Sequence, residues 1–492
     1  MNPIRRLAGQ TMIYGLSSIL GRLLNYFLVP LYTRVFQTGE YGVITEMYAY
    51  VALFFVILTY GMETAFFRFA QETEPKKVYS TSLISLLATS LIFILAAVFT
   101  SGYTASSLGY ADHPEYISWF AIIIGLDAFT AIPFARLRQE NRPIRFAAVK
   151  IFSITANILL NLFFILLCPY LWNHSAADSS LHLILSRVYD PSVGVGYVFI
   201  SNLISSGLTL LLLLPCVRDA GWQFDRALWK KMIAYALPLL VMGLAGTINE
   251  SFDRILLKHL LPDPSTAMSE LGIYGACYKI SILMTLFIQT FRFAAEPFFF
   301  SEFKKQDARQ TYALVMNYFI IICALIFLAV MVYIDVVRHF VGKDYYPGLK
   351  VVPILLMANL FLGVFYNLSI WYKLTNRTLY GAYISLFGAG LSLLLNYITI
   401  PLMGYMGSAW THLACYGSMM VISYFLGQKY YPIAYSLKKA FGYLSLALVL
   451  YFLQDALRTG STVTDLISGT LALFLFAVPV WMIEKRQLAR LS

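Results

Sequence analysis

The sequence predicts an all-α, polytopic membrane protein with about 14 transmembrane helices. Its 492 residues are 59% hydrophobic and only 12% charged, whereas soluble domains are about half apolar and about a quarter charged. Such a chain cannot cover its apolar surface with polar side chains, so most of that surface must face lipid. The apolar residues also gather in runs of about 20, the length that a helix needs to cross a bilayer.

Fourteen apolar runs follow one another along the chain. The first run follows Arg5 and Arg6 and continues past Pro30 without a signal-peptide cleavage site, so we expect an uncleaved first span. The predicted spans are 11–32, 43–66, 80–101, 116–135, 147–169, 194–216, 232–257, 272–296, 311–334, 350–370, 380–401, 405–427, 440–456 and 465–483.

Two polar breaks divide these spans into groups, because charged residues cluster at 218–231 and again at 429–439. We therefore expect an N-terminal six-helix lobe (1–217), a C-terminal six-helix lobe (218–428) and two additional helices with a short cytoplasmic tail (429–492).

Lysine and arginine are concentrated in every second connection between the spans. If the N-terminus is cytoplasmic, 25 of them fall in cytoplasmic segments and 6 in external ones. Cytoplasmic loops of membrane proteins carry such an excess of basic residues, so we expect both termini in the cytoplasm. The net charge of +11 therefore reflects membrane topology. No basic and aromatic stripe indicates a nucleic-acid partner.

Catalytic, metal-binding and cofactor-binding motifs are missing from the sequence. Its five cysteines stand alone within apolar runs, without a CxxC motif or a cluster of cysteine and histidine. No Walker motif indicates ATP hydrolysis, and no loop is long enough to form a catalytic domain. We expect a protein that is not an enzyme and holds no metal or cofactor. Energy would come from an ion gradient, the membrane potential or the gradient of the substrate.

A short internal repeat relates the two halves. The sequence TRVF at 33–36 ends the first span and EYGV at 40–43 begins the second, while DRIL at 253–256 and ELGI at 270–273 stand at the same points of spans seven and eight. Six spans per half is an even number, so the halves would share one orientation. They would be related by an axis along the membrane normal, with a site at their interface.

Several charged side chains stand within the predicted spans, where an ion costs several kcal/mol unless it faces a cavity or a partner. Most of them belong to spans 1, 2, 7 and 8, the equivalent pairs of the two halves, as expected for a chamber that both halves line. They are Arg22, Glu46, Glu63, Asp127, Glu250, Asp253, Arg254, Lys279, Arg292 and Glu296.

Simpler explanations apply to some of these charges. Glu250 and Arg254 are four residues apart and could neutralise each other on one helix. Glu46 and Glu296 are close enough to span ends to reach the membrane interface. Asp127 could pair with Arg136 or Arg138 near the cytoplasmic surface.

Arg22 and Lys279 fit a cavity better. Arg22 lies about 16 Å along the helix from Thr11, which places it near the membrane midplane, and Ser18 and Asn25 share its face. Cations that face a water-filled cavity indicate an anionic ligand, most naturally a phosphate. The acidic residues that could couple transport to H⁺ or Na⁺ are Glu63, Asp127, Glu250 and Asp253.

Five short motifs resemble one family of membrane exporters. SILGRLLN at 18–25, PLYTR at 30–34 and EYG at 40–42 are similar to the N-terminal pattern of polysaccharide biosynthesis flippases. NESFDR at 249–254, followed by GIY at 272–274, resembles the seventh span of the same family. These are the O-antigen (lipopolysaccharide) and capsule exporters of the multidrug/oligosaccharidyl-lipid/polysaccharide (MOP) superfamily.

The resemblance implies a fold and a substrate. The fold would be two six-helix lobes around a V-shaped central cavity, with two added helices. The substrate would be an undecaprenyl-pyrophosphate-linked oligosaccharide, flipped across a bacterial inner membrane. The cationic cavity of the family would correspond to Arg22, Lys279, Arg292 and Arg254. The partners would be this lipid-linked substrate, membrane lipids and a polysaccharide polymerase or chain-length machinery.

Three other functions remain open. A multidrug/cation antiporter of the same fold should favour acidic over basic cavity residues, and Arg22 and Lys279 count against it. A peptidoglycan-precursor flippase would share the fold with a different cargo. A multi-spanning polysaccharide polymerase typically carries a large external loop with catalytic arginines, whereas Arg187 is the only basic residue in the longest external loop expected here, 170–193.

Overall fold

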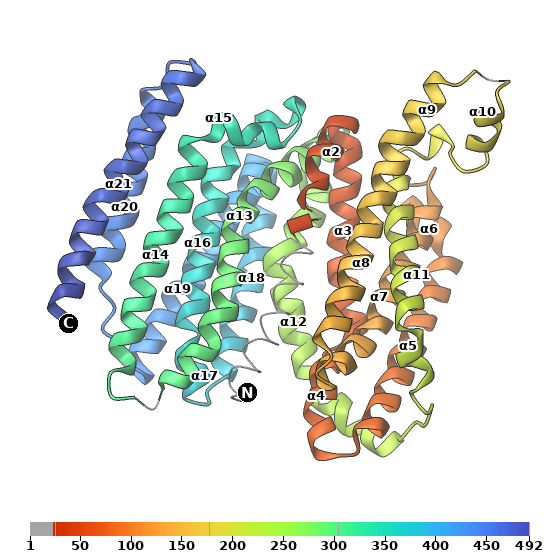
Figure 1. Ribbon diagram of the computed structural model, residues 1–492, viewed down its shortest axis with the longest axis horizontal. Helices are drawn as coiled ribbons and strands as arrows, with labels where there is room; N and C mark the ends of the chain where they lie inside the picture. Colours follow the sequence, from red (N-terminus) through yellow and green to blue (C-terminus); the bar gives the residue numbers. More distant parts are fainter. Residues whose placement is uncertain (1–22, 25, 177, 304, 492) are drawn as a thin grey trace. The chain divides into compact units, whose positions relative to one another are not determined.

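The computed structural model describes residues 23–491 apart from Asn25, Ala177 and Lys304 (Figure 1). In this part of the chain all regular elements are helices, as predicted. They form two compact units. The first contains the described residues up to Phe36 together with Val43–Ile255, and the second contains Gln37–Gly42 together with Leu256–Ser492.

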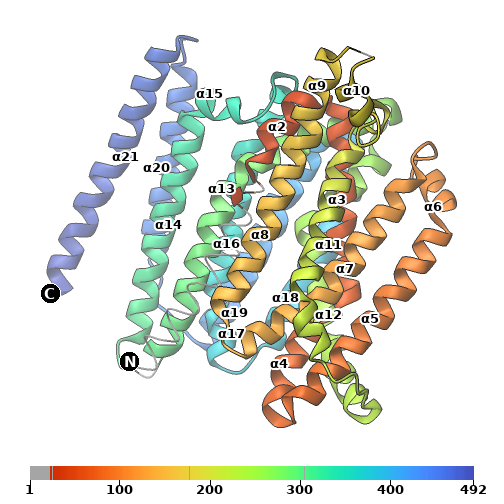
Figure 2. The same cartoon turned by 45° about the vertical axis from the view of Figure 1, so that its right-hand side comes forward.

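The first unit consists of long helices that run up and down, joined by short helical turns (Figure 2). They are α2 (Leu28–Val35), α3 (Thr38–Thr59), α4 (Met62–Glu72), α5 (Pro75–Phe99), α6 (Ser101–Ser107), α7 (Pro114–Gln139), α8 (Pro143–Leu162), the π-helical turn η1 (Phe163–Leu167), α9 (Cys168–His174), α10 (Ser180–Leu185), the 3₁₀ turn η2 (Pro191–Val193), α11 (Gly196–Arg218) and most of α12 (Arg226–Leu260).

Local sequence explains where several of these helices begin. Pro75, Pro114 and Pro143 stand at the start of α5, α7 and α8, where a proline lacks only an N–H group that would be unpaired anyway. The second predicted span is interrupted at Gly61, whose φ of 74° separates α3 from α4. A side chain there would also approach Leu239 and Ala236 to about 3 Å, so this break depends on glycine.

The main core of the first unit lies where several of its helices meet. Phe66, Tyr79, Leu83, Ile132 and Met232 are among its buried members. They come from α4, α5, α7 and α12, so the first half of α12 packs with the N-terminal helices. The predicted lobes 1–217, 218–428 and 429–492 stay a prediction.

The second unit contains the remaining helices. They are α13 (Pro264–Glu302), α14 (Ala308–Val332), α15 (Ile334–Val337), the 3₁₀ turns η3 (Arg338–Phe340) and η4 (Lys343–Val351), α16 (Val352–Leu368), α17 (Ile370–Leu374), α18 (Leu379–Met403), α19 (Tyr405–Tyr430), α20 (Leu437–Ala456) and α21 (Thr462–Leu491). The closest packing joins α16 to α19, α18 to α19 and α14 to α20.

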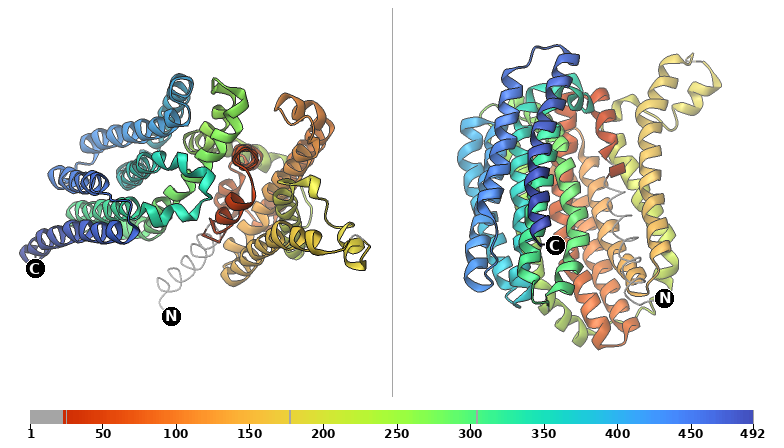
Figure 3. Two further views of the ribbon diagram at one scale, coloured as in Figure 1. Left: turned by 90° about the horizontal axis from the view of Figure 1, so that it is seen from above. Right: turned by 60° about the vertical axis from the view of Figure 1, so that its left-hand side comes forward.

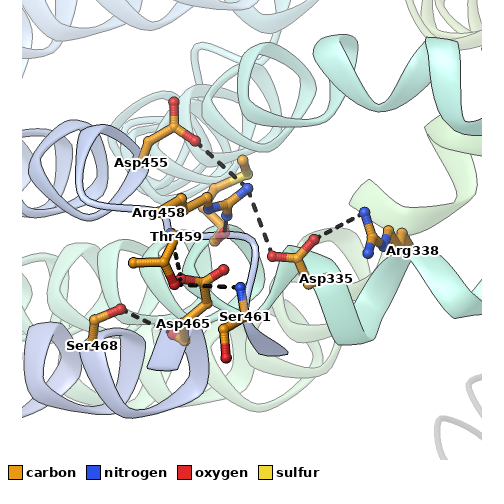
Figure 4. Close-up of polar contacts among 9 residues, drawn as sticks. Asp335, Arg338, Asp455, Arg458, Thr459, Ser461, Asp465 and Ser468 are labelled. Atoms are coloured by element: carbon orange, nitrogen blue, oxygen red, sulfur yellow. Dashed lines mark hydrogen bonds and ion pairs between the residues drawn. The ribbon is translucent and has the colours of Figure 1, made fainter. Parts of the chain in front are cut away.

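The last two helices, α20 and α21, belong to the second unit and pack beside α14 (Figure 3). At the turn between α20 and α21, Arg458 lies 3.9 Å from the Asp335 carboxylate and donates to the Met331 carbonyl at 3.0 Å. Asp465 accepts the backbone N–H of Thr459 at 3.0 Å in the same cluster (Figure 4).

At the opposite end, Lys439 of α20 lies 2.7 Å from Glu484 of α21, which also accepts a hydrogen bond from the Tyr443 hydroxyl. These contacts join α20 to α21, and α20 packs against α14.

Two glycines allow the first turn of α3 to cross α13 within the second unit. A Cβ on Gly42 would lie 2.1 Å from the Met268 carbonyl oxygen, and one on Gly272 would lie 1.8 Å from the Thr38 carbonyl oxygen. Thr38 and Ser269 share a hydrogen bond of 2.7 Å at the same crossing. Gly42 and Gly272 occupy matching positions of the internal repeat, and their contacts are reciprocal.

Eleven helices in the described part of the chain are long and apolar enough to cross a membrane. Two further helices, α19 and α20, coincide with the predicted spans 405–427 and 440–456. The first predicted span, 11–32, lies mostly outside the described residues, and α2 includes its end. The prediction of an all-α polytopic membrane fold is confirmed.

Candidate functional site

A small cavity in the second unit is lined by charged and polar residues from α13, α16 and α17. It measures about 20 Å³. The residues that give it its chemistry are Arg292 and Glu296 of α13, Tyr366 and Asn367 of α16, and Lys373 of α17.

One carboxylate lies between two cations in this cavity. Glu296 Oε1 is 2.7 Å from Lys373 Nζ, and Glu296 Oε2 is 3.9 Å from Arg292 Nε. The Arg292 guanidinium also lies 4.8 Å from the centre of the Tyr366 ring, in cation–π geometry. The two cations and one anion leave a formal charge of +1 at the cavity, which favours an anion.

An amide lines the same cavity. The Asn367 side chain is only 6% exposed, and its Nδ2 donates to no acceptor among the described residues. Buried polar groups of this kind are normally hydrogen-bonded. A cavity that contains a buried, unused N–H donor beside two cations is suited to an oxygen-rich ligand.

Helix geometry explains why these residues meet. Tyr366, Ile370 and Lys373 are spaced i, i+4 and i+7, so they lie on one face across the junction of α16 and α17. Gly363 allows the close approach of α16 to its neighbours, because a Cβ there would lie 2.6 Å from the Phe319 ring. Phe319 belongs to α14, and the same Cβ would lie 3.0 Å from Ile288 of α13, so α16 packs closely against both helices.

A larger, apolar groove lies on another side of α16. Its volume is about 900 Å³, near the upper end of the range of about 300–1,000 Å³ for ligand pockets. It runs between α14, α16, α19 and α20, with Met316, Leu360, Met420, Leu444 and Leu448 among its lining residues.

The first unit contains a partly buried polar group between its helices. Asp127 of α7 accepts a hydrogen bond from Ser206 of α11 at 2.8 Å, and Lys150 of α8 interacts with it electrostatically. The Lys150 ammonium lies 4.1 Å from the centre of the Phe134 ring. A carboxylate and an ammonium thus lie near each other within predicted spans, where ionic groups usually have a function.

Residues 7–304 match the family model described as polysaccharide biosynthesis protein. The match covers more than half of the chain. The chain belongs to this polysaccharide biosynthesis family. Comparison with curated protein sequences gave no match.

Solved structures show which fold this family member has. A lipid II flippase MurJ in an inward closed conformation aligns with a TM-score of 0.69 and 13% identity, over 96% of this chain and 99% of its own. An inward-facing multidrug resistance MATE transporter of the MOP superfamily aligns with a TM-score of 0.66 and 14% identity, over 87% and 97%. The protein therefore has the multi-pass membrane fold of MOP transporters and flippases.

The cations predicted to bind substrate in this family member are not all brought together. Arg292 lines the cavity, while Lys279 lies thirteen residues earlier on α13 (292 − 279), about 20 Å along the helix axis. Arg254 belongs to the first unit, and Arg22 lies outside the described residues. The role of all four in binding stays a prediction.

The acidic candidates for ion coupling have different surroundings. Glu63 forms an ion pair with Arg138, and Asp127 contacts Ser206 and Lys150 as described above. Asp253 is buried, at 1% exposure, while Glu250 is exposed on α12. Asp253 is buried and Asp127 is partly buried, so both are better candidates than the exposed Glu250.

Two simpler explanations from the sequence are wrong. Glu46 does not reach the membrane interface, because its side chain is fully buried and accepts a hydrogen bond from Tyr110. Glu296 pairs with Lys373, and its position at the membrane interface stays a prediction.

Asp127 pairs with neither predicted arginine, because Arg136 binds Glu140 and Arg138 binds Glu63. In both cases a nearer partner, Tyr110 or Ser206, comes from a part of the chain that is distant in sequence.

Sequence reasoning missed Lys373, Asn367 and Lys150. Both lysines fell near span ends and were counted as topology signals. Lys373 follows Tyr366 by seven residues, which places the two on one helical face, and this spacing was the available signal. No sequence pattern indicated Asn367.

Proposed function

We propose that this family member is an alternating-access flippase. Its substrate would be an undecaprenyl-pyrophosphate-linked oligosaccharide, such as an O-antigen, capsule or exopolysaccharide repeat unit, and it would move this substrate across the bacterial inner membrane. The family match to polysaccharide biosynthesis proteins supports the saccharide. The likeness to a protein named a lipid II flippase supports a lipid-linked cargo.

The observation that carries the proposal is the pair of sites on α16. Gly363, Tyr366 and Asn367 line the cationic cavity, whereas Leu360, Val364 and Leu368 line the apolar groove. The proposed substrate combines a diphosphate with a long hydrocarbon chain. One helix thus offers a surface for each part, the cavity for the diphosphate and the groove for the chain. An organic cation would be repelled by the charge of the cavity.

The remaining predicted cations would serve the same anionic substrate. Arg254, Lys279 and Arg22 would bind the pyrophosphate or acidic sugars at other stages of transport, as strong donors to phosphate and carboxylate oxygens. This assignment is supported by their residue types and their positions within predicted spans.

Asp127 is the best candidate for coupling transport to H⁺ or Na⁺. Its carboxylate is enclosed within the first unit with Ser206 as a hydrogen-bond donor and Lys150 nearby. Binding of a proton or Na⁺ would change the charge balance between Asp127 and Lys150. Asp253 is the second candidate, followed by Glu250 and by Glu63, whose carboxylate is already paired with Arg138.

The proposed setting follows from topology and cargo. Both termini would be cytoplasmic, as the distribution of basic residues predicts. The flipped repeat units would be consumed by a polysaccharide polymerase with its chain-length machinery. The flippase itself would catalyse no covalent step.

A deletion strain tests this function directly. We expect the strain to lose surface polysaccharide and to accumulate lipid-linked repeat units on the cytoplasmic leaflet, and the wild-type chain to restore both. Unpolymerised units on the outer leaflet would indicate a polymerase instead. Unchanged polysaccharide with new sensitivity to cationic drugs would indicate an antiporter, and accumulated peptidoglycan precursors would indicate a precursor flippase.

A further inference from the structure

We propose that the cavity between α13, α16 and α17 is a diphosphate-binding site in which the Glu296 carboxylate takes the place of the ligand. The substrate anion would enter by displacing Glu296 from Lys373 and Arg292. This inference rests on the proposed function, because it assigns the phosphate end of that substrate to named residues.

The donors around the cavity match a phosphate. The Arg292 guanidinium offers several N–H groups in a planar fork, and the Lys373 ammonium is a compact charge with three N–H groups. Asn367 adds a neutral N–H donor from a side chain that is 94% buried, the complement of its 6% exposure, and that has no acceptor in the described part of the chain. Together they offer donors from three directions to an anion with several oxygens.

Glu296 already occupies the position that such an anion would take. Its two carboxylate oxygens face Lys373 at 2.7 Å and Arg292 at 3.9 Å. The remaining space of about 20 Å³ suffices for about one water molecule. A phosphate group therefore fits only after the Glu296 side chain has moved away, and its 38% exposed carboxylate has access to solvent for that movement.

Displacement has a structural consequence. The contact between Glu296 and Lys373 is an ion pair that ties α13 to α17. A phosphate that binds Lys373 breaks the ion pair between Glu296 and Lys373. Arg292 and Lys373 then contact the ligand instead of Glu296. The ion pair also competes with the ligand, so the site releases its anion readily, as a transporter requires.

An ion pair on the same helix provides a matched control. Glu302 near the end of α13 lies 2.8 Å from Lys305, close to the distance between Glu296 and Lys373. Neither Glu302 nor Lys305 lines the cavity. Replacing Glu302 by glutamine changes the net charge of the protein by the same amount as Glu296→Gln, without altering the proposed site.

The experiment uses the full chain, purified into nanodiscs of phosphatidylcholine, with inorganic pyrophosphate as the probe in calorimetric titrations. Glu296→Gln should bind pyrophosphate about tenfold more tightly than wild type, because the competing negative charge is removed. Lys373→Met and Asn367→Leu should each weaken binding about tenfold or more. Glu302→Gln should match wild type, and thermal unfolding of each variant checks that it folds.

Three results would overturn the proposal. The first is unchanged affinity in Glu296→Gln, and the second is an equal gain in Glu302→Gln, which would make the effect one of net charge alone. The third is loss of the pyrophosphate signal when phosphatidylglycerol replaces phosphatidylcholine, which would assign the site to membrane phospholipid. Glu296→Gln still tests the proposal if Lys373→Met does not fold.

The same variants separate this inference from the proposed function. Normal export and unchanged pyrophosphate binding in Lys373→Met would refute the site and leave the flippase intact. Pyrophosphate binding that depends on Lys373, in a protein whose deletion leaves lipid-linked repeat units unaltered, would refute the flippase and leave the site.

Discussion

Individual polar residues within the spans of this protein are paired by tertiary contacts. Glu46 with Tyr110, Glu63 with Arg138, and Glu296 with Lys373 each join residues from different helices or connections. Of these, only Glu46 is fully buried, and a buried polar group that loses its partner costs more free energy than the pair contributes, whereas Glu63 and Arg138 are each about 40% exposed and such pairs contribute little to stability. Among these pairs, substitution at Glu46 or Tyr110 should therefore have the largest effect on stability.

Asp127 is the residue at which ion coupling can be tested. Asp127→Asn keeps an oxygen that can accept from Ser206 and removes the charge beside Lys150. Because a neutral amide cannot exchange a proton or balance Na⁺, we expect export to lose its dependence on the ion gradient, with activity at least tenfold lower. Transport into proteoliposomes with and without an imposed gradient measures this. Gradient-dependent transport at the wild-type rate would exclude Asp127 from coupling.

A substitution at Tyr110 tests how much the hydrogen bond to the buried Glu46 carboxylate contributes to stability. Tyr110→Phe removes the hydroxyl that donates to Glu46, so we expect the free energy of unfolding to fall by about 1–3 kcal/mol. Chemical unfolding in detergent measures the loss. Tyr103→Phe, at a side chain that is 81% exposed, is the control and should be neutral.

At the scale of elements, two contacts between helices can be tested. One is the crossing of α3 with α13 at Gly42 and Gly272. The other is the ion pair between Asp225, at the start of α12, and Lys77 of α5. The crossing brings backbones together where any side chain would collide. Such small residues are how membrane helices approach closely.

Gly272→Ala tests the crossing. Its methyl group would meet the Thr38 carbonyl oxygen at 1.8 Å, so the helices must move apart, and we expect a loss of about 1–3 kcal/mol in the free energy of unfolding. Gly39→Ala is the matched control in the first turn of α3, because a Cβ there meets nothing within 4 Å. Equal stability of the two variants would show that the helices are not held at this distance.

The pH dependence of stability tests the role of the Asp225 carboxylate at the start of α12. Its carboxylate lies 2.8 Å from Lys77 of α5 and accepts the backbone N–H groups of Ala227 and Leu228. Lys77 first, and then these amides, lower the pKa of Asp225 to about 2. Since the folded pKa lies below the ordinary value of 3.8, the ionised carboxylate stabilises the fold above about pH 4 and loses this effect as pH falls toward 2.

We therefore expect Asp225→Asn to lower the melting temperature at pH 7, with a difference from wild type that narrows as pH is lowered from 4 toward 2. Thermal unfolding across this range measures it. Asp219→Asn, at an exposed position of the same connection, should show no such narrowing. A difference that stays constant with pH would exclude the charge of Asp225 as its cause.

At the scale of the whole molecule, the groove beside α20 links the added C-terminal helices to the proposed function. Leu448→Trp places a larger side chain in the groove, so we expect export of lipid-linked repeat units to fall at least tenfold while the protein remains folded. Leu453→Trp on the same helix is the control, because Leu453 is exposed and does not line the groove. Normal export in Leu448→Trp would exclude the groove as the place of the hydrocarbon chain.

Hydropathy, charge placement and a few short motifs were sufficient to predict much of this protein. They indicated a polytopic α-helical membrane protein, most of its helices and its family, because the apolar length of a span and the glycines at its ends are local properties of the chain. They also singled out Arg292 as a charge that needs a cavity or a partner.

The composition of the cavity depends on packing between distant helices. Lys373 reaches the Glu296 carboxylate from 77 residues away (373 − 296), and Lys150 meets Asp127 from a neighbouring helix. Hydropathy is nearly the same on every face of these helices, so it does not indicate how each helix is rotated or which face meets which neighbour. Contacts such as the approach of Gly363 to Phe319 select that rotation, and with it the partners of each charge.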